Sequence, residues 1–263
     1  MAARPAALTI AGSDPSGGAG LQADLKTFHQ FGVYGEAAVT LVTVQNTAGV
    51  AAVELLRPEL VAAQIQAVVS DIPPQAAKTG ALGNAALIVA VAHAAASFLF
   101  PLVVDPVMIG KHGAPLLDAS AVRVLKQSLV PLAALLTPNL AEAAALTGRQ
   151  VSTVDAMREA ARALADAGAK NVLVKGGHLA GAAVDVLFTD GRFLELPAPR
   201  IATPHTHGTG CTYSAAITAL LARGVPLVPA VEQAKRWITR AIETNPGLGH
   251  GAGPLNHFAP TEP

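Results

Sequence analysis

The residues best suited to chemistry lie in the segment Thr206–Thr212, which has the sequence THGTGCT. Gly208 and Gly210 come directly before an Ala-rich stretch with a helical pattern. A helix N-terminus presents unpaired backbone N–H groups and a partial positive charge, and glycines let an anion approach the backbone closely. Cys211, the only cysteine of the chain, stands where that anion would bind. The segment therefore predicts a phosphate cradle with one ionisable side chain, which suggests phosphoryl transfer.

Polar residues also follow the predicted strands at the points where the strands end. They are Gly12-Ser13-Asp14, Gln45-Asn46-Thr47, Lys78-Thr79-Gly80, Asp105-Pro106, Thr137-Pro138-Asn139 and Lys175-Gly176-Gly177. Ligands gather at the carboxyl ends of the strands in a parallel sheet. A series of such ends, in order along the chain, predicts one long site at an edge of the sheet.

Several of these side chains have both a structural and a functional interpretation. The amide of Gln45 offers a donor beside an acceptor, which suits an amino-substituted nitrogen heterocycle; otherwise it caps a strand. Lys175 ends a buried strand, where either a phosphate or a carboxylate must neutralise its charge. Asp24 lies early in a helix and, taken alone, would stabilise the helix dipole. Lys235, taken alone, would be a surface charge on a helix.

Asn139 and Glu142 stand together at the start of a predicted helix. In isolation, this spacing indicates an N-cap with its capping-box partner. Together with Asp105 on the neighbouring strand end, the same side chains suit a Mg²⁺ ion that keeps several of its waters. The residues alone leave both interpretations open.

Three other interpretations are disfavoured. The loop Gly12–Gly20 (GSDPSGGAG) lacks the Lys-Ser/Thr pair of a P-loop and the spacing of a dinucleotide fingerprint. His205 and His207 form a pair with no evident third metal ligand nearby. No cysteine-hydrolase signature surrounds Cys211.

The composition narrows the class of protein. The chain has 263 residues, 14% of them charged, and a formal net charge of zero, which gives no electrostatic case for binding nucleic acid or an anionic membrane. A single cysteine excludes an internal disulfide framework and fits the reducing cytoplasm. The apolar stretch Ala85–Val104 is interrupted by polar residues and a proline, so it predicts a buried helix and strand instead of a membrane span. The first residues predict a strand, not a signal peptide.

Short apolar runs alternate with longer helical patterns along the chain. Strands are predicted over Ala7–Ala11, Ala38–Val44, Ala76–Thr79, Leu102–Asp105, Ala134–Thr137, Val172–Lys175, Val184–Phe188 and, after a hairpin signal, Arg192–Leu196. Helices are predicted over Leu21–Phe31, Pro58–Val69, Asn84–Phe98, Ala119–Leu129, Leu140–Leu146, Thr153–Ala167, Thr212–Arg223 and Val228–Thr244. This alternation predicts an α/β fold, with a mostly parallel sheet covered on both faces. The absence of a clear linker predicts a single domain over residues 1–263.

Taken together, these motifs resemble a known family. Over nearly its whole length the chain is similar to the hydroxymethylpyrimidine/phosphomethylpyrimidine kinases of thiamine biosynthesis, within the ribokinase-like superfamily. The resemblance rests on AGSDPSGGAGLQADLKTF (Ala11–Phe28), QNT (Gln45–Thr47), DPVM with the following Lys111, TPNLAEAAALTG (Thr137–Gly148), VKGGH (Val174–His178), THGTGCTYSAA (Thr206–Ala216) and GPLNHF (Gly253–Phe258). It implies a three-layer α/β/α sandwich and a cytoplasmic homodimer. It also implies that ATP phosphorylates the pyrimidine alcohol and then its monophosphate.

The resemblance assigns roles residue by residue. The residues expected at the pyrimidine and its hydroxymethyl arm are Gly12, Asp24 and Gln45. Those expected around the transferred phosphoryl group are Gly208, Gly210 and Cys211, with Cys211 at the position of the catalytic base. Those expected at the nucleotide phosphates are Lys175, Lys235 and Thr209. Those expected to organise Mg²⁺ and its waters are Asp105, Asn139 and Glu142.

Some features qualify this assignment. A thiol at a helix N-terminus has a lowered pKa, which favours some thiolate at Cys211, although nearby phosphates would raise that pKa. The family commonly has Met where this chain has Ala81, and Asn where it has His205. The Ala81 departure implies a roomier ring pocket and keeps a pyridoxal kinase, or a dual-specificity enzyme, as the alternative function. A non-catalytic pyrimidine-binding regulatory module on the same fold is a second alternative.

Overall fold

A nine-stranded sheet forms the centre of the protein in the computed structural model, which describes residues 4–108, 117, 119–179, 181 and 183–261. The strands are β1 (Ala6–Ser13), β2 (Tyr34–Asn46), β3 (Gly49–Leu55), β4 (Ala76–Thr79), β5 (Leu102–Val104), β6 (Leu135–Leu136), β7 (Val172–Val174), β8 (Ala183–Thr189) and β9 (Arg192–Ala198). Their order across the sheet is β3-β2-β1-β4-β5-β6-β7-β8-β9. The pairs from β2 to β7 are parallel, and the pairs at both edges are antiparallel.

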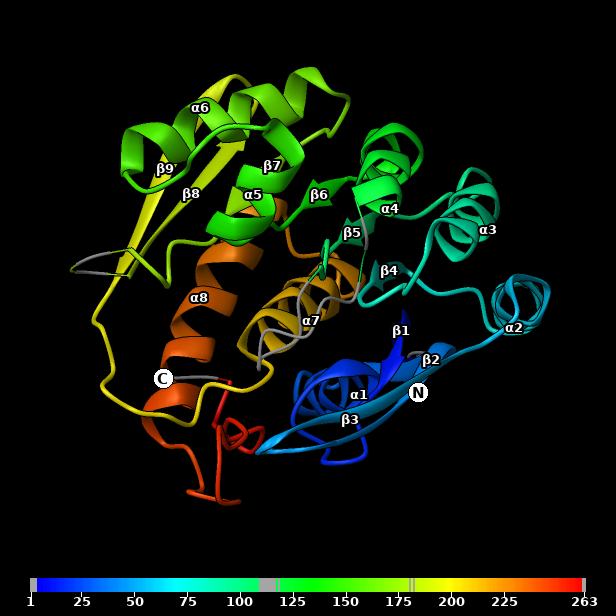
Figure 1. Ribbon diagram of the computed structural model, residues 1–263, viewed down its shortest axis with the longest axis horizontal. Coiled ribbons are helices and arrows are strands. Elements are labelled where there is room, and N and C mark those ends of the chain that lie inside the picture. Colours follow the sequence, from blue (N-terminus) through cyan, green and yellow to red (C-terminus); the bar gives the residue numbers. More distant parts are fainter. Residues whose placement is uncertain (1–3, 109–116, 118, 180, 182, 262–263) are drawn as a thin grey trace.

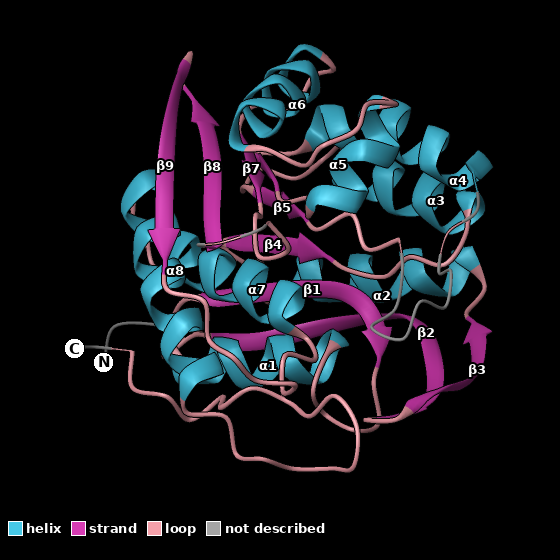
Figure 2. Cartoon of the chain, turned by 60° about the vertical axis from the view of Figure 1, so that its left-hand side comes forward, coloured by secondary structure: helices cyan, strands magenta, loops and turns pink. Residues whose placement is uncertain are grey.

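Helices cover both faces of this sheet (Figures 1 and 2). They are α1 (Gly20–Gln30), α2 (Pro58–Asp71), α3 (Ala85–Ala95), α4 (Ala119–Val124), α5 (Leu140–Thr147), α6 (Val154–Asp166), α7 (Thr209–Ala222) and α8 (Leu227–Glu243). Helices α1, α7 and α8 lie on one side of the strands, and the remaining helices lie on the other side (Figure 2). The predicted three-layer α/β/α sandwich with a mostly parallel sheet is therefore confirmed.

Two hydrophobic clusters fill the spaces between the three layers. Along β1, Leu8 and Ile10 belong to one cluster, whereas Ala7, directly before Leu8, belongs to the other. Successive side chains of a strand point to opposite faces of the sheet, so a strand buried on both faces is apolar throughout. This is why the parallel strands appear in the sequence as continuous apolar runs.

The predicted helices are all present, and the stretch around Ala85–Val104 forms α3 followed by β5, as expected. None of the described helices is both long and apolar enough to cross a membrane. The helix predicted to run to Leu129 changes at Val124 into a π-helical turn, Leu125–Leu129. The hairpin predicted after Asp190 is the antiparallel pair β8–β9.

One strand was not predicted. β3 pairs antiparallel with β2 and forms an edge of the sheet. Its residues Val50–Val53 form an apolar run like those of the central strands, but most of its side chains are exposed, as in an edge strand. Together β2 and β3 form a hairpin along one side of the molecule (Figure 1).

Candidate active site

The N-terminus of α7 is built for close contact with another backbone. Gly208 is its N-cap and has φ of 76°, in the left-handed region that favours glycine. A Cβ atom on Gly208 would lie only 1.9 Å from the carbonyl oxygen of Gly18. The two glycine-containing loops of the sequence therefore touch backbone to backbone, with no room for a side chain between them.

Asp14 organises the first of these loops from inside. Its Oδ1 accepts hydrogen bonds from the backbone N–H of Ser16 (2.9 Å) and from the Ser16 hydroxyl (2.7 Å), and its Oδ2 accepts one from the N–H of Ala19 (2.9 Å). Burial alone would raise the pKa of Asp14, but the hydrogen bonds from His207 and Ser16 hold it below its usual value. The loop is thus wrapped around an ionised carboxylate.

His207 connects the two loops. Its Nε2 lies 2.8 Å from Oδ2 of Asp14 and 3.0 Å from Nε2 of Gln45. Its backbone N–H donates to the carbonyl of Gly253 (3.1 Å). His207 is therefore part of the scaffold between the loops and is unavailable as half of a metal-binding pair with His205.

Asp105 and Lys175 form an ion pair beneath the start of α7. Lys175 Nζ donates to Oδ1 of Asp105 at 2.8 Å, and the hydroxyl of Ser214 on α7 donates to Oδ2 at 3.1 Å. Asp105 is buried, which raises its pKa, but the charges of Lys175 and Lys78 outweigh this effect and lower it overall. A Cβ on Gly210 would lie 3.2 Å from Lys175 Nζ and 3.9 Å from Asp105 Oδ2. Glycine at this position therefore opens the helix N-terminus to the ammonium group.

Asn139 and Glu142 form the capping box that their spacing indicated. Asn139 Oδ1 accepts from the N–H of Glu142 (2.9 Å), and Glu142 Oε2 accepts from the N–H of Asn139 (2.7 Å). Burial raises the pKa of Glu142 to about 7, with Lys175 opposing this rise and Asp105 adding to it. Glu142 therefore lies within electrostatic reach of the Asp105–Lys175 pair.

These oxygen atoms can be compared with what Mg²⁺ requires. The oxygens of Asp105 already accept from Lys175, Thr137 and Ser214, and Asn139 Oδ1 is occupied by the cap. Within the described part of the chain, no three His, Cys, Asp or Glu side chains are grouped as metal ligands. Two neighbouring carboxyl groups nevertheless suit an ion that keeps its own waters. The residues thus fit a hydrated Mg²⁺ and do not fit one ligated only by protein.

Asp24 lies on the buried side of α1, beneath the first loop. Its Oδ2 accepts from Lys78 Nζ (2.7 Å) and from the Thr9 hydroxyl (2.6 Å), and both members of the ion pair are fully buried. Its Oδ1 is buried and has no hydrogen-bond partner among the described residues. The interpretation of Asp24 as a first-turn acid is wrong, because α1 has no acidic residue in its first turn. One carboxylate oxygen of Asp24 is therefore unpaired among the described residues.

The environment of Cys211 differs from the expectation for a helix N-terminus. Burial raises the pKa of its thiol to about 12, with Lys78 lowering it, Asp24 and Asp105 raising it, and a backbone hydrogen bond from Gly20 lowering it. The predicted lowering of this pKa is therefore wrong for the protein without ligand. Loss of hydration outweighs the favourable helix terminus.

Lys235, Thr209 and Gly12, which were also predicted to belong to the site, each have neighbours of their own. Lys235 Nζ on α8 is paired with Asp185 Oδ2 at 2.6 Å, so it is not the free surface charge expected of it in isolation. The hydroxyl of Thr209 donates to the carbonyl of Thr206 (2.8 Å). A Cβ on Gly12 would lie 2.5 Å from Cδ1 of Leu41, so the strand end is closely packed there. Lys111, in the stretch that resembles the family, lies outside the described residues.

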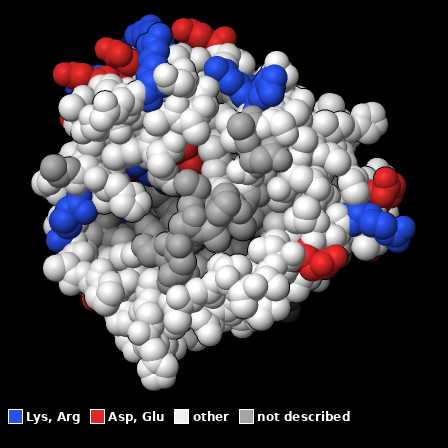
Figure 3. Space-filling view, in the orientation of Figure 1, with Lys and Arg blue, Asp and Glu red and all other residues white. Residues whose placement is uncertain are grey.

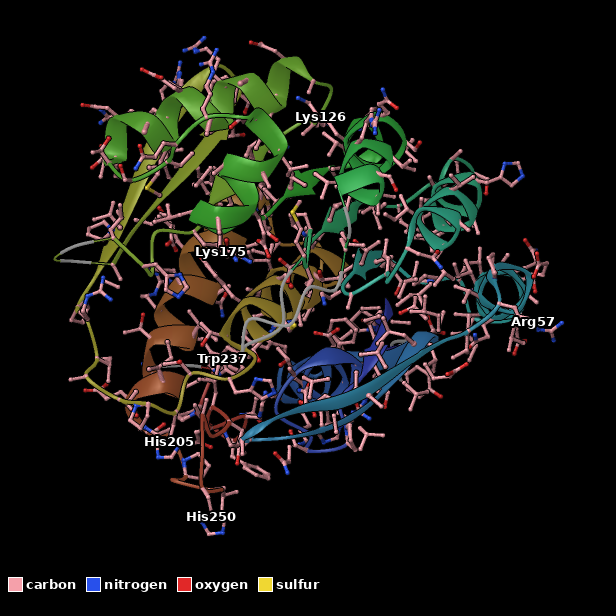
Figure 4. The ribbon with its side chains drawn as sticks, in the orientation of Figure 1. Arg57, Lys126, Lys175, His205, Trp237 and His250 are labelled. Atoms are coloured by element: carbon pink, nitrogen blue, oxygen red, sulfur yellow. The ribbon has the colours of Figure 1, made fainter. Side chains whose placement is uncertain are left out.

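The structure thus gathers most of the predicted residues around the start of α7. The face shown in Figure 3 is hollowed near its middle, and acidic and basic atoms are visible at the hollow. Lys175 lies near the middle of the molecule, whereas Arg57 and His250 lie at its margins (Figure 4). Asp185 was not predicted as part of the site, and Lys78 was named only among the strand-end residues, with no partner or role. The ionic character of Lys78 and its place at a strand end were the only signals of it in the sequence.

Comparison with known proteins agrees with this geometry. The sequence model of a family described as phosphomethylpyrimidine kinase matches residues 14–256. The hydroxymethylpyrimidine/phosphomethylpyrimidine kinase of Haemophilus influenzae is 51% identical over 258 residues, which are 96% of this chain and 96% of that protein. The thiamine biosynthesis bifunctional protein ThiED of Geobacter sulfurreducens is also 51% identical, over 98% of this chain, and the match spans 53% of that protein.

Solved structures show the same similarity. An ADP complex of Bacillus subtilis pyridoxal kinase is 40% identical with a TM-score of 0.91, covering 98% of both chains. Pyridoxal kinase from Staphylococcus aureus, in complex with AMP-PCP and pyridoxal, is 34% identical with a TM-score of 0.89, covering 98% of this chain and 95% of that one. Phosphomethylpyrimidine kinase from Clostridium difficile 630 is 44% identical with a TM-score of 0.81, covering 91% of this chain and 100% of that one. With its ribokinase-like fold and a match over most of its length, the chain belongs to the phosphomethylpyrimidine kinase family.

Proposed function

We propose that the chain transfers the γ-phosphoryl group of ATP to 4-amino-5-hydroxymethyl-2-methylpyrimidine, and then to the resulting monophosphate, in thiamine biosynthesis. The observation that carries this proposal is the opening at Gly210. There the N-terminus of α7 faces Lys175, which itself lies 2.8 Å from Asp105. A helix terminus and an ammonium group directed at one point form a site for a phosphoryl group.

The pyrimidine is bound by the strand ends and by α1. Gln45 offers an amide to the ring, and the free Oδ1 of buried Asp24 accepts a hydrogen bond from a donor of the substrate. Gly12, packed closely against Leu41, brings the backbone of this strand end to the ring. Lys78 and Thr9 hold Asp24 in place through its other oxygen.

The nucleotide lies with its phosphates toward Lys175. Lys175 and the backbone N–H groups of residues 208–211 contact the transferred phosphoryl group, and Thr209 and Lys235 line the nucleotide side. The Staphylococcus aureus relative, solved with AMP-PCP, supports ATP as the donor. Mg²⁺, held through water by Asp105, Glu142 and Asn139, supplies neutralisation of phosphate charge when it is bound.

The chemical step is a displacement at the γ-phosphorus. A bond forms between the alcohol oxygen of the substrate and the phosphorus, and the bond to the bridging oxygen of ADP breaks. Because the transition state is loose, the alcohol proton becomes acidic only after most of this change, and positioning matters more than a strong base. Cys211 lies at the position of the base, but its thiol, with a pKa raised to about 12, remains protonated at neutral pH. Its proposed role is to shape the anion hole, and the alcohol proton passes to an oxygen of the transferred phosphoryl group or to water.

Pyridoxal phosphorylation is the second candidate function. Pyridoxal also carries a hydroxymethyl arm on a nitrogen ring, and two of the similar structures are of pyridoxal kinases. The small side chain of Ala81 in the KTGAL stretch leaves room for a larger ring. A non-catalytic regulatory module is disfavoured by the complete set of Gly210, Lys175 and Asp105.

The molecular context completes the proposal. We expect a single domain over residues 1–263 that works in the cytoplasm, where its lone thiol stays reduced. We also expect a homodimer. Its interface is supported by the exposed apolar side chains of Val42 (45% exposed) and Val44 (62% exposed) on the β2–β3 hairpin.

The proposal is tested by product analysis. The purified protein is incubated with ATP and Mg²⁺ and with either hydroxymethylpyrimidine or pyridoxal, and the products are separated by mass. We expect mono- and diphosphate from the pyrimidine, with kcat/KM well above the value for pyridoxal. A higher kcat/KM for pyridoxal would overturn the first choice, and binding of the pyrimidine without turnover would favour the regulatory module.

A further inference from the structure

One nitrogen atom in this site has two polar neighbours that make incompatible demands on it. Nε2 of His207 lies 2.8 Å from Oδ2 of Asp14 and 3.0 Å from the amide of Gln45. A single imidazole nitrogen is either a donor or an acceptor, never both. The arrangement therefore determines which end of the Gln45 amide faces His207.

Asp14 fixes the proton on this nitrogen. Its carboxylate is 3% exposed and already accepts hydrogen bonds from Ser16 and from the N–H of Ala19. The hydrogen bonds that it receives outweigh burial and keep its pKa below the usual value, so it is an acceptor at neutral pH. Nε2 of His207 must therefore carry a hydrogen atom and donate it.

The other nitrogen of the ring agrees with this assignment. Nδ1 of His207 is buried and has no hydrogen-bond partner among the described residues. A buried N–H without an acceptor costs more than a buried lone pair, which can remain weakly solvated or unpaired at lower cost. The single ring proton therefore belongs on Nε2.

The proton on Nε2 of His207 determines the orientation of the Gln45 amide. If its NH₂ group faced Nε2–H, two donors would oppose each other at 3.0 Å. Rotation of the amide by 180° exchanges oxygen and nitrogen in the same space, so that Oε1 shares the Nε2–H of His207 with Asp14 as a second acceptor. The NH₂ group then points away from His207, and Oε1 keeps a second lone pair.

We infer that Asp14 and His207 are positioning residues that hold the amide of Gln45 in one orientation. In that orientation the site binds a 4-aminopyrimidine in preference to a 4-oxopyrimidine. The inference rests on the proposed function, in which Gln45 faces the ring. The locked amide donates from its NH₂ group to a ring nitrogen and accepts an exocyclic N–H with Oε1. A 4-oxo ring in its lactam form presents a carbonyl and a ring N–H, which is the opposite pattern.

The surroundings of His207 hold its backbone and its ring in place. The backbone of His207 is held by Gly253, and the next residue, Gly208, is in contact with the carbonyl of Gly18. A Cβ on Gly18 would lie 2.7 Å from Cδ2 of the His207 ring, so the ring rests directly against that glycine. Gly18 therefore restricts movement of the His207 ring on that side.

The test compares two pyrimidines that differ only at position 4. The probes are 4-amino-5-hydroxymethyl-2-methylpyrimidine and 5-hydroxymethyl-2-methylpyrimidin-4(3H)-one, and the readout is the ratio of their kcat/KM values. We expect the wild-type protein to favour the amino compound by about 100-fold or more, because the wrong ring leaves buried polar groups unpaired. In His207→Phe the amide rotates freely, and the ratio should fall to about 10-fold or less.

Two further variants separate positioning from folding. Gln45→Glu keeps the acceptor toward His207 but removes the donor toward the ring, so its preference for the amino compound should also be lost. Ser16→Ala removes one partner of Asp14 without touching His207, and it should keep the wild-type ratio. A wild-type ratio in folded His207→Phe or in Gln45→Glu, even with lower turnover, would overturn the inference.

Failure of the proposed function has a different signature. If the wild-type protein phosphorylates neither pyrimidine, the dissociation constants of the two compounds, measured by calorimetry, replace kcat/KM in the ratio. An equal affinity of the wild-type protein for both rings would contradict the fixed orientation of the Gln45 amide. A strong preference in binding for the amino compound that disappears in His207→Phe and in Gln45→Glu would support the fixed orientation of the amide even without turnover.

Discussion

The thiol of Cys211 lies at the first turn of α7, yet its surroundings favour the neutral form. Burial raises its pKa to about 12, against the opposing effect of Lys78 and with the support of the two aspartates nearby. A negatively charged phosphoryl group at the same place would disfavour the thiolate further. This environment disfavours a thiolate base at neutral pH and agrees with the proposal that the helix terminus and Lys175 stabilise the transferred group.

This leads to a prediction at Cys211 itself. Because the thiolate is the reactive form, the rate of alkylation by iodoacetamide should rise steadily with pH up to about pH 10 without levelling off. Cys211 is the only cysteine of the chain, so mass spectrometry reports on this site alone. Free cysteine in the same buffers is the control. A plateau between pH 6 and 8 would restore the base role.

Some features of single residues in the site could be predicted from the sequence, and others could not. The types and positions of Gly208, Gly210 and Lys175 were sufficient to predict an anion site, because their chemistry is local. The partners were not predictable: Asp24 and Lys78 are separated by 54 positions, and nothing in either segment names the other. The pKa of Cys211 could not be predicted either, since it depends on burial that only the fold creates.

At the scale of elements, β2 carries an unusual carboxyl group at its beginning. Glu36 is 8% exposed, its Oε2 has no hydrogen-bond partner among the described residues, and Asp71 at the end of α2 is nearby. Burial, and to a lesser extent the charge of Asp71, raise its pKa to about 7. Because the folded-state pKa is above that of the unfolded chain, ionisation of Glu36 opposes folding. The fold is unaffected below about pH 4.5 and loses stability as the pH rises to about 7.

We therefore expect Glu36→Gln to stabilise the protein at high pH only. The melting temperature of the variant should exceed that of the wild type by several degrees at pH 8 and should match it at pH 4.5. Glu54→Gln on the adjacent strand β3 is the matched control, because that carboxylate is exposed and should change the melting temperature little. An equal gain at both pH values would show that ionisation of Glu36 is not the cause.

Elements with a buried face were the predictable part of the fold. The strand predicted at Ala76–Thr79 was confirmed with the same bounds, and all of its residues, including the polar Lys78 and Thr79, are buried. β3 was missed although it contains the apolar run Val50–Val53, and the exposure of its side chains reflects its place at the edge of the sheet. The antiparallel pairing of β7 with β8 was also unpredictable, since direction depends on how the chain returns to the sheet and not on the strand sequence.

At the scale of the whole molecule, the β2–β3 hairpin leaves an apolar surface uncovered. Val42 and Val44 project from the same face of β2, and Ala52 on β3 is paired with Val44. An exposed edge strand with apolar side chains is a surface on which a second chain can pack. This surface is the basis for the homodimer proposed above.

A homodimer should have twice the mass of one chain, and a charge placed in its interface should dissociate it. Light scattering during size-exclusion chromatography should give about 53 kDa for the wild type, twice the mass of the 26.5 kDa chain. Val44→Lys places a charge in the proposed interface and should give the monomer mass. Leu99→Lys is the control, because Leu99 is fully exposed and lies outside the hairpin. Dissociation by both variants, or by neither, would argue against this interface.

The contact between Asp14 and His207 has a consequence for how the protein reaches its active form. The two residues are 193 positions apart, and closing so long a loop carries a large entropic cost that only late, cooperative packing can offset. The parallel sheet can be largely assembled before Gly18 and Gly208 meet. During refolding from denaturant, recovery of far-ultraviolet circular dichroism should precede recovery of ligand binding. Catalytic competence is then among the last properties the folding chain acquires, and a partly folded enzyme is an inactive one.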